Sequence, residues 1–422
     1  MSMMTRTAVI ASTLMLYSCS GIAAREPLDC TLAYSDPALS QCSIVRYASE
    51  FSDCISSSDI SEHTCLILDS DARFCNSQTS VPITAFFTES NRTLDCSDGT
   101  IDHGWGRVSL PSGPATTQGS YKPGVRLLDD ESLENLSVKN CTIRGTNHMG
   151  IKASRFFGGE LGGNGKIDAD ESLPVGHRQL KFENLTIEDT ITGIFLGNFS
   201  EDVTIDQVHI DNSSRIAIYS EAGSHRIRIK DSIISNNQTR EAVAIDSTYD
   251  SEITGSLFVN NREGAINLYQ NCGELKGIVC PIVRSTPPNN NQITDNIFVG
   301  NGVSGVQVAS RQGRNHSLGW CATLNGLPGK FVDTAQDNIV SNNTFVCDQG
   351  TSLIIKDGPN QVTNNRVIAR HDCVPFEIST GGLSRSYSDV LNGLQFNNNT
   401  IDSSLSPRLR NINNEIEYSD NQ

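Results

Sequence analysis

The sequence predicts an all-β solenoid, a coil of short parallel strands, and the first reason is a phrase that recurs nine times. The phrase is an Asn, Gln or Ser followed by an aliphatic–x–aliphatic triplet. Its first residue is, in order, Asn140, Asn184, Gln207, Ser232, Ser256, Asn296, Asn343, Asn365 and Asn399. The shortest intervals are 22 to 25 residues, which is the length of one solenoid rung, and each longer interval indicates a rung that carries an insertion.

The second reason is the pattern inside each rung. Segments such as 185–187 and 208–210 alternate with the period of two that is typical of a strand. A second polar column follows at a fixed step: Asp189, Asn212, Asn237, Asn261, Asn301 and Asp348. Rungs stack about 4.8 Å apart, so the side chains of a column can hydrogen-bond along the stack and satisfy backbone groups in the turns. We therefore expect an asparagine ladder.

With this ladder, the chain resembles the right-handed parallel β-helix proteins, the superfamily of pectate lyases, alginate epimerases and lyases, and NosD-like periplasmic proteins. The resemblance covers residues 82 to 405, and the segment 91–100 (NRTLDCSDGT) resembles an opening rung. It implies an all-β, right-handed parallel β-helix solenoid of about nine or ten rungs with an N-terminal disulfide-rich cap. It does not specify a reaction, because function depends on sites grafted onto the fold.

The expected organisation has four parts: a signal peptide (1–24), a Cys-rich N-terminal cap (25–80), the β-helix (81–405) and a C-terminal tail (406–422). Arg6, an apolar stretch to Tyr17 and small residues to Ala24 are typical of an export signal. No later stretch is long and apolar enough to span a membrane. We expect a secreted or periplasmic protein, with a lipoprotein anchored at Cys19 as the alternative.

Cysteine usage supports an oxidising compartment. The chain has 13 Cys, and cleavage after residue 24 leaves an even number for disulfides. Six of the Cys that remain after cleavage lie before residue 100, where a disulfide-stapled cap would cover the unpaired edge of the first rung. Their spacing fits no zinc pattern. Cys141 is expected to face inward in a rung, where a small apolar residue suffices.

The net charge of −16 argues against nucleic-acid binding. More than half of the excess lies in residues 26–100, so an acidic total leaves room for a basic site elsewhere. The loop 311–330 contains basic residues and no carboxylate, and it could face a polyanion.

Three insertions, near 155–178, 270–291 and 311–335, follow the same strand of their rungs and so leave the same corner. Loops stacked on one edge of a solenoid can wall a lateral groove for an extended polysaccharide, although they could instead only shield the stack. Within the groove the predicted outward column is Lys152, Phe195, Tyr219, Ala244, Asn267, Gln307 and Ile354. Two residues further on, the parallel column is Ser154, Gly197, Glu221, Asp246, Tyr269, Ala309 and Lys356.

These columns suggest polysaccharide lyase or C5-epimerase chemistry, which needs a base, an acid and a group that neutralises the substrate carboxylate. The candidate catalytic residues are Tyr219, Glu221, Asp246, Tyr269 and His225. The candidate substrate-binding residues are Lys152, Asn267, Arg240, Arg262, Arg311 and Trp320. Glu221 and Asp246 could alternatively bind Ca²⁺, because hard oxygen ligands on adjacent rungs suit that ion.

Other functions remain open. Glu221 and Asp246 could be the carboxyl pair of a glycoside hydrolase. The protein could also be a non-catalytic glycan-binding or surface β-helix, or a NosD-like accessory protein. The Asp-Pro-His motif associated with alginate epimerases is missing, as are the Asn-Thr-Asp, Asp-Asp and Gly-His-Gly motifs of polygalacturonase-type β-helices. Exposed Tyr, Glu and Asp also commonly decorate a solvated sheet.

Overall fold

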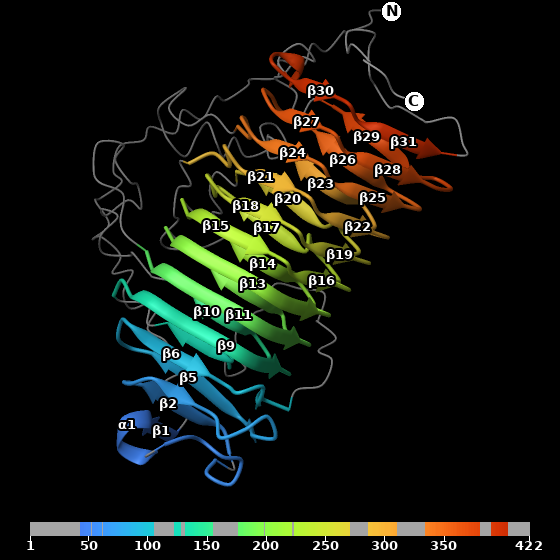
Figure 1. Ribbon diagram of the computed structural model, residues 1–422. Coiled ribbons are helices and arrows are strands. Elements are labelled where there is room, and N and C mark those ends of the chain that lie inside the picture. The colour runs from blue at the N-terminus through green and yellow to red at the C-terminus, as the bar shows by residue number, and fades with distance from the viewer. Residues whose placement is uncertain are drawn as a thin grey trace, which may run out of the picture.

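A computed structural model describes residues 43–104, 122–127, 131–154, 176–270, 286–309, 334–379 and 390–403, except 52, 61, 198 and 222. The chain winds into a stack of rungs, with β1 at one end and β31 at the other (Figure 1). Every strand pairing is parallel, and each strand pairs with its counterparts in the rungs before and after it. No helix in the described part of the chain is long and apolar enough to cross a membrane.

One side of the stack is a twelve-stranded sheet, here called sheet A. Its strands, in spatial order, are β1 (Ser43–Arg46), β2 (Thr64–Leu68), β5 (Ile83–Phe87), β8 (Val125–Leu127), β10 (Met149–Ala153), β12 (Thr192–Leu196), β14 (Ile216–Ser220), β17 (Val243–Asp246), β20 (Ile266–Tyr269), β23 (Ser304–Val308), β26 (Thr351–Ile355) and β29 (Val374–Ile378).

The rest of each rung forms a second sheet, here called the bent sheet, which has two limbs. Three long strands run through both limbs: β9 (Glu134–Arg144), β11 (Arg178–Glu188) and β13 (Glu201–Asp211). The first limb also contains β3 (Ala72–Arg73), β6 (Arg92–Asp95), β15 (His225–Lys230), β18 (Glu252–Thr254), β21 (Gln292–Thr294), β24 (Ile339–Ser341), β27 (Gln361–Thr363) and β30 (Gln395–Asn397). The second limb contains β4 (Ser80–Val81), β7 (Thr100–Asp102), β16 (Ile233–Ser235), β19 (Leu257–Val259), β22 (Ile297–Val299), β25 (Thr344–Cys347), β28 (Arg366–Ala369) and β31 (Thr400–Ser403).

Residues in the left-handed conformation make the corners of a rung. In one rung they are Gln179 (φ 55°), Asn184 (φ 51°) and Asp189 (φ 51°). Short polar side chains tolerate positive φ better than other non-Gly residues, because they can hydrogen-bond to the local backbone. Polar residues therefore recur at the corners for a conformational reason.

The repeat in the sequence suggests that the nine residues form a single column. They do not. Asn140, Asn184 and Gln207 occupy the corner itself, with φ of 51° to 54°. From Ser232 onward the repeated residue follows the corner: Asp231 has φ 50°, and the pairing of His209 with Ile233 places Ser232 beside Val208. The buried slot that holds an aliphatic side chain in the early rungs thus holds a polar one in the later rungs.

The second predicted column has the same one-residue change. Asp189 and Asn212 occupy the corner with positive φ, whereas Asn237, Asn261 and Asn301 lie one position later and are buried. The last member, Asp348, is exposed. A single polar phrase in the sequence therefore describes two different structural positions.

The buried positions do form asparagine ladders. The Asn343 Oδ1 accepts the backbone N–H of Asn296 at 3.0 Å, and its Nδ2 donates to the Ile293 carbonyl at 2.8 Å. Asn365 continues the same column by accepting the Asn343 N–H at 3.1 Å. A further ladder that the sequence analysis did not identify runs along another corner through Ser251, Asn291, Asn338 and Asn360. Each ladder provides hydrogen bonds to buried backbone groups at the corners, where strand pairing provides none.

Aliphatic side chains fill the interior of the coil, as the alternation predicts. Three phenylalanines stack through successive rungs of the second limb, with ring centroids 5.0 Å apart for Phe258 and Phe298 and 4.7 Å apart for Phe298 and Phe345. Burial of such aromatic columns is a large favourable term, and offset stacking adds to it.

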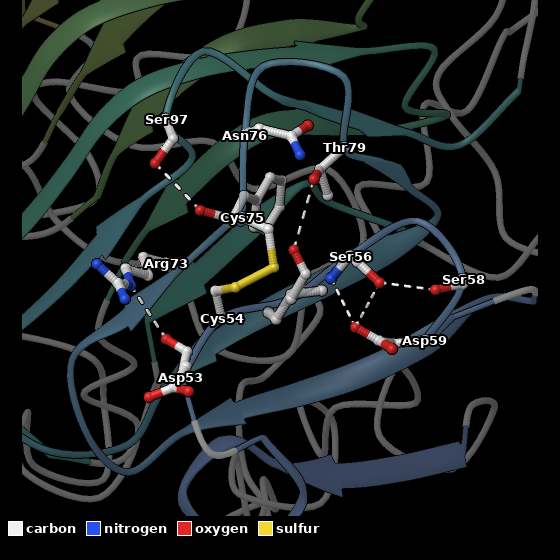
Figure 2. Close-up of a disulfide and its surroundings, with 12 residues drawn as sticks. Asp53, Cys54, Ser56, Ser58, Asp59, Arg73, Cys75, Asn76, Thr79 and Ser97 are labelled. Atoms are coloured by element: carbon white, nitrogen blue, oxygen red, sulfur yellow. Dashed lines mark hydrogen bonds between the residues drawn. A yellow bond between two sulfur atoms is a disulfide. The ribbon is translucent and has the colours of Figure 1, made fainter.

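The predicted disulfides are present. Cys54 bonds to Cys75, as Figure 2 shows, and Cys347 bonds to Cys373. Cys141 faces inward with 2% of its surface exposed, but the expectation that it acts only as a small apolar residue is wrong, because it bonds to Cys96. The two Cα atoms are 4.8 Å apart, which is the spacing of adjacent rungs.

Rung pairing begins before the predicted boundary at residue 81. The strand β2 pairs in parallel with both β1 and β5, and β3 pairs with β6. The short helix α1 (Tyr47–Glu50) follows β1 directly. The coil therefore extends into the region that the sequence analysis assigned to a cap.

Candidate functional site on the outer face of sheet A

The strand register aligns the predicted outward column, although Ala244 and Ile354 in it are buried. Consecutive pairings join Lys152, Phe195, Tyr219, Ala244, Asn267, Gln307 and Ile354 in this order. Arg126 precedes Lys152 in the same column, and Glu377 follows Ile354. The sequence analysis missed both ends of this column. The strand β8 carries no repeated phrase, and β29 follows the last strand that the sequence analysis aligned.

The second column is also in place. Asp246 pairs directly with Tyr269, and Glu221 follows Ser220, which pairs with Ile245. However, Asp246 has 0% and Tyr269 has 2% of its surface exposed, so the expectation that they face solvent is wrong. Glu221 and Tyr219 are partly exposed.

The burial of Tyr269 has a local cause. Its ring packs with Ile216 and Ala244 in a small apolar cluster outside the main core, with Tyr219 against the edge of the cluster. Because Ala244 has only a methyl group, the Tyr269 ring can reach across the sheet toward the preceding rung. Its hydroxyl donates to Oε1 of Glu241 at 2.7 Å.

Arg240 and Glu241 form an ion pair around this hydroxyl, in which the Glu241 carboxylate is buried and Arg240 is partly exposed. Nε of Arg240 lies 3.2 Å from Oε2 of Glu241, and Nη2 lies 3.0 Å from Oε1. Nη2 also donates to the Tyr269 oxygen at 3.3 Å. Burial alone would raise the pKa of Glu241, but the Arg240 charge and hydrogen bonds lower it below its usual value. Arg240, predicted to neutralise a substrate, is thus already compensated by a carboxylate that the sequence analysis missed.

Tyr219 is the half-exposed phenol of the site. Its hydroxyl donates to Oδ2 of Asp246 at 3.0 Å, and Oδ1 of Asp246 accepts from the Ser247 hydroxyl at 3.2 Å. The ring of Phe195, one rung earlier, meets the Tyr219 ring edge to face with centroids 5.5 Å apart. A buried carboxylate and an aromatic neighbour therefore fix the direction of the Tyr219 hydroxyl.

Cationic side chains lie at the N-terminal end of the same column. The pKa of His148 is lowered to about 3, first by burial and then by the charges of Lys152, Arg126 and Arg215. The imidazole is consequently neutral at pH 7. Lys152 and Arg126 lie two and three rungs before Tyr219, and Arg215 immediately precedes β14, the strand of Tyr219.

Of the remaining predicted residues, Asn267 lies in the outward column and the other described ones lie elsewhere. His225 stacks on Tyr249, with centroids 4.9 Å apart, and its Nε2 is 3.8 Å from Glu201, at the corner where the first limb begins. Arg262 has a largely exposed side chain 3.8 Å from Glu263. Asn267 lies between Ala244 and Gln307 in the outward column. Arg311 and Trp320 lie outside the described residues, as do most of the three insertions.

Within the described ranges, no group of three or more His, Cys, Asp or Glu side chains is arranged to hold a metal ion. Glu221 and Asp246 come from adjacent rungs, and their role as Ca²⁺ ligands stays a prediction.

Residues 123–278 match the family model described as right handed beta helix region. The chain is a right-handed parallel β-helix. No curated protein matches its sequence. Among solved structures, this β-helix is similar to the periplasmic alginate epimerase AlgG, with 10% identity over 85% of this chain and 76% of the epimerase, at a TM-score of 0.52.

Two other solved structures have lower TM-scores. The lacto-N-biosidase of Eubacterium ramulus shares 10% identity over 75% of this chain, at a TM-score of 0.45. The β-helix spans 53% of the length of that enzyme. An alginate lyase from Paenibacillus sp. shares 14% identity over 79% of this chain and 97% of the lyase, at a TM-score of 0.38. These similarities concern the fold.

Proposed function

We propose that the outer face of sheet A binds an extended anionic polysaccharide and acts on it by lyase or C5-epimerase chemistry, with Tyr219 as the proton-transfer group. The observation that carries this proposal is the hydrogen bond from the half-exposed Tyr219 phenol to the buried carboxylate of Asp246. Tyr219 lies in the same column as the cationic residues Lys152 and Arg126. The disulfides support the associated proposal that the protein is exported to an oxidising compartment.

The column offers the two kinds of contact that a sugar chain requires. Phe195 and Tyr219 supply aromatic surface, on which the apolar face of a sugar ring can pack. Toward the C-terminal end, Asn267 and Gln307 supply amides, and Nζ of Lys356 lies 3.5 Å from Oε1 of Gln307. The Asn267 Oδ1 is buried and has no hydrogen-bond partner among the described residues, so a substrate hydroxyl would supply one.

Removal of the C5 proton of a uronate requires stabilisation of the negative charge that develops on its carboxyl group. Lys152 is the partly exposed cation in register with Tyr219, two rungs away, and it supplies this stabilisation. Arg126 lies one rung further and is buried. Arg240 does so less effectively, because Glu241 already compensates its charge.

The hydroxyl proton of Tyr219 points to Asp246, so the proposed step has the phenol oxygen meet the substrate as an acceptor. In the proposed step, the Tyr219 oxygen accepts the C5 proton while its own proton passes to Asp246. The electron pair of the C–H bond then expels the 4-linked sugar, whose oxygen takes a proton from water, and an unsaturated uronate results. Alternatively, water protonates C5 from the opposite face, which gives the C5 epimer. In either case the hydroxide that forms takes the proton from Asp246.

The experiment is an assay of the full chain, without its export segment, against alginate, pectate, a glycosaminoglycan and a neutral glycan, with and without Ca²⁺. Ultraviolet absorbance detects an unsaturated uronate, reducing-end counts detect hydrolysis, and proton NMR in D₂O detects exchange at C5. New absorbance or C5 exchange that is lost in Tyr219→Phe supports the proposal. Reducing ends without absorbance would overturn it in favour of hydrolysis. Binding without chemistry on any substrate would reduce it to a glycan-binding role.

A further inference from the structure

Two histidines from different rungs meet at the N-terminal end of the β-helix, far along the stack from Tyr219. His63 immediately precedes β2, and His103 immediately follows β7. Their ring centroids are 5.1 Å apart and the ring planes are inclined by 51°. Two imidazoles that bind one tetrahedral ion through bonds of about 2.0–2.1 Å hold their ring centres roughly 5 Å apart.

The hydrogen bonding of both rings leaves nitrogen lone pairs unused. The Nδ1 of His63 lies 3.1 Å from the Pro82 carbonyl, which can only accept, so Nδ1 carries the proton and Nε2 the lone pair. Metal-binding histidines are usually oriented by such a bond from the other ring nitrogen to a carbonyl or carboxylate.

His103 has only a weak contact of this kind, to the Pro123 carbonyl. Both of its ring nitrogens are buried, and neither makes a hydrogen bond of good geometry with the described residues. The carbonyl of Pro123, which lies beside the ring, already accepts from the Thr84 hydroxyl at 2.8 Å. A buried polar group without a partner is costly, so a ligand that satisfies a His103 nitrogen would be favoured.

Charges of both signs surround the two rings. Lys122 lies near both rings, and Asp102 immediately precedes His103. The charge of Lys122 would repel a cation, and the Asp102 carboxylate beside His103 offsets this repulsion.

We propose that His63 and His103 form a two-histidine binding site for a transition-metal ion such as Zn²⁺ or Cu²⁺. Water completes the coordination, because the described residues add no third ligand. The site joins the turn before β2 to the end of β7 and thereby ties the first rungs together. It is independent of the polysaccharide proposal.

The test uses the untagged, chelator-treated full chain, titrated with ZnSO₄ in a calorimeter and with CuCl₂ monitored by electron paramagnetic resonance. We expect one ion per chain, a Cu²⁺ spectrum with nitrogen hyperfine structure, and a higher melting temperature as Zn²⁺ is added. The variant His103→Phe preserves the ring contact but removes a ligand, and it should weaken affinity about tenfold or more.

Two further variants make the test specific. His209→Ala removes a histidine from the second limb and should leave Zn²⁺ affinity unchanged. Lys122→Met removes the repelling charge and should tighten binding, which a merely structural role of the histidine pair does not predict. The proposal is overturned if the double variant His63→Ala/His103→Phe binds Zn²⁺ as tightly as the wild-type protein, or if neither protein binds at roughly 100-fold molar excess.

Discussion

The Tyr219 hydroxyl donates a hydrogen bond of 3.0 Å to Asp246 Oδ2, and these two residues lie on adjacent rungs of sheet A. The carboxylate is fully buried, whereas the phenol is half exposed, so the pair joins a solvent-facing group to a proton acceptor behind it. Glu221, in the same predicted column as Asp246, is partly exposed instead. Under the proposed function, this relationship favours Tyr219 over the buried Tyr269 as the proton-transfer group.

Tyr219→Phe is therefore expected to lower the rate of unsaturated-uronate formation or C5 exchange by about 10²- to 10⁴-fold, because it removes the proton-transfer group. Polysaccharide affinity should change little, since the ring remains. Tyr249→Phe is the matched control, because Tyr249 stacks on His225 at a corner away from this column. Equal rates in the two variants would show that Tyr219 does not transfer the proton.

Arg240→Met is expected to destabilise the protein by about 1–3 kcal/mol, because it leaves the buried Glu241 carboxylate without its partly exposed cationic partner. The double variant Arg240→Met/Glu241→Gln should be less destabilised, since it removes both charges together. Urea denaturation followed by circular dichroism measures the difference. If the double variant were as unstable as the single one, the pair would not be the main interaction of either side chain.

Asn343→Ala is expected to cost about 2–4 kcal/mol, because it leaves the buried N–H of Asn296 and the carbonyl of Ile293 without partners. Asn343→Ser should cost less, because Ser fills this position in the rungs of Ser232 and Ser256. The neighbouring Asn342→Gly is the control: Asn342 is exposed with φ 58°, a conformation that Gly adopts freely. Equal losses for residues 342 and 343 would contradict the distinction between corner and ladder positions.

Removal of the Cys96–Cys141 disulfide in Cys96→Ala/Cys141→Val is expected to cost about 2–4 kcal/mol, since it frees a loop of 45 residues in the unfolded chain. Val fits position 141, because the column continues through the buried aliphatics Leu185 and Val208. Thermal unfolding with and without a reducing agent measures the effect. Reducing agent should lower the melting temperature of the variant less than that of the wild type.

Acidification should destabilise the fold through His148. Its pKa is about 3 in the folded protein, whereas the ordinary value of 6.5 applies to the unfolded chain, which therefore binds the proton more readily. The contribution of His148 to stability is complete above pH 6.5 and is lost as the pH falls toward about 3, at up to about 1.4 kcal/mol per pH unit. His148→Gln should flatten this dependence between about pH 6.5 and pH 4 in denaturation curves. An unchanged slope would show that His148 is not buried in its neutral form.

The fold was predictable because its information is local and repeated. The period-two alternation within 185–187 and 208–210 determined which side chains of the bent sheet face inward. The same alternation in the second strand of each rung placed Tyr219, Asn267 and Lys152 in one column. Residue parity in a strand is a geometric consequence of the pleat, so it can be read from a few consecutive residues. A repeat of 22 to 25 residues then set the stacking.

The tertiary structure decided what depends on contacts between rungs. Asp246 and Tyr269 lie on the predicted face but are buried, because the Tyr269 ring crosses the small Ala244 and bonds to Glu241. Sequence reasoning missed Glu241 because it precedes the alternating segment of β17. The one-residue change between corner and ladder positions was equally hidden, since both accept Asn and only backbone φ separates them. The sequence by itself thus determined the solenoid and the face of each side chain. Burial, pairing and the choice of Tyr219 over Tyr269 depended on side chains reaching across rungs, which local periodicity does not encode.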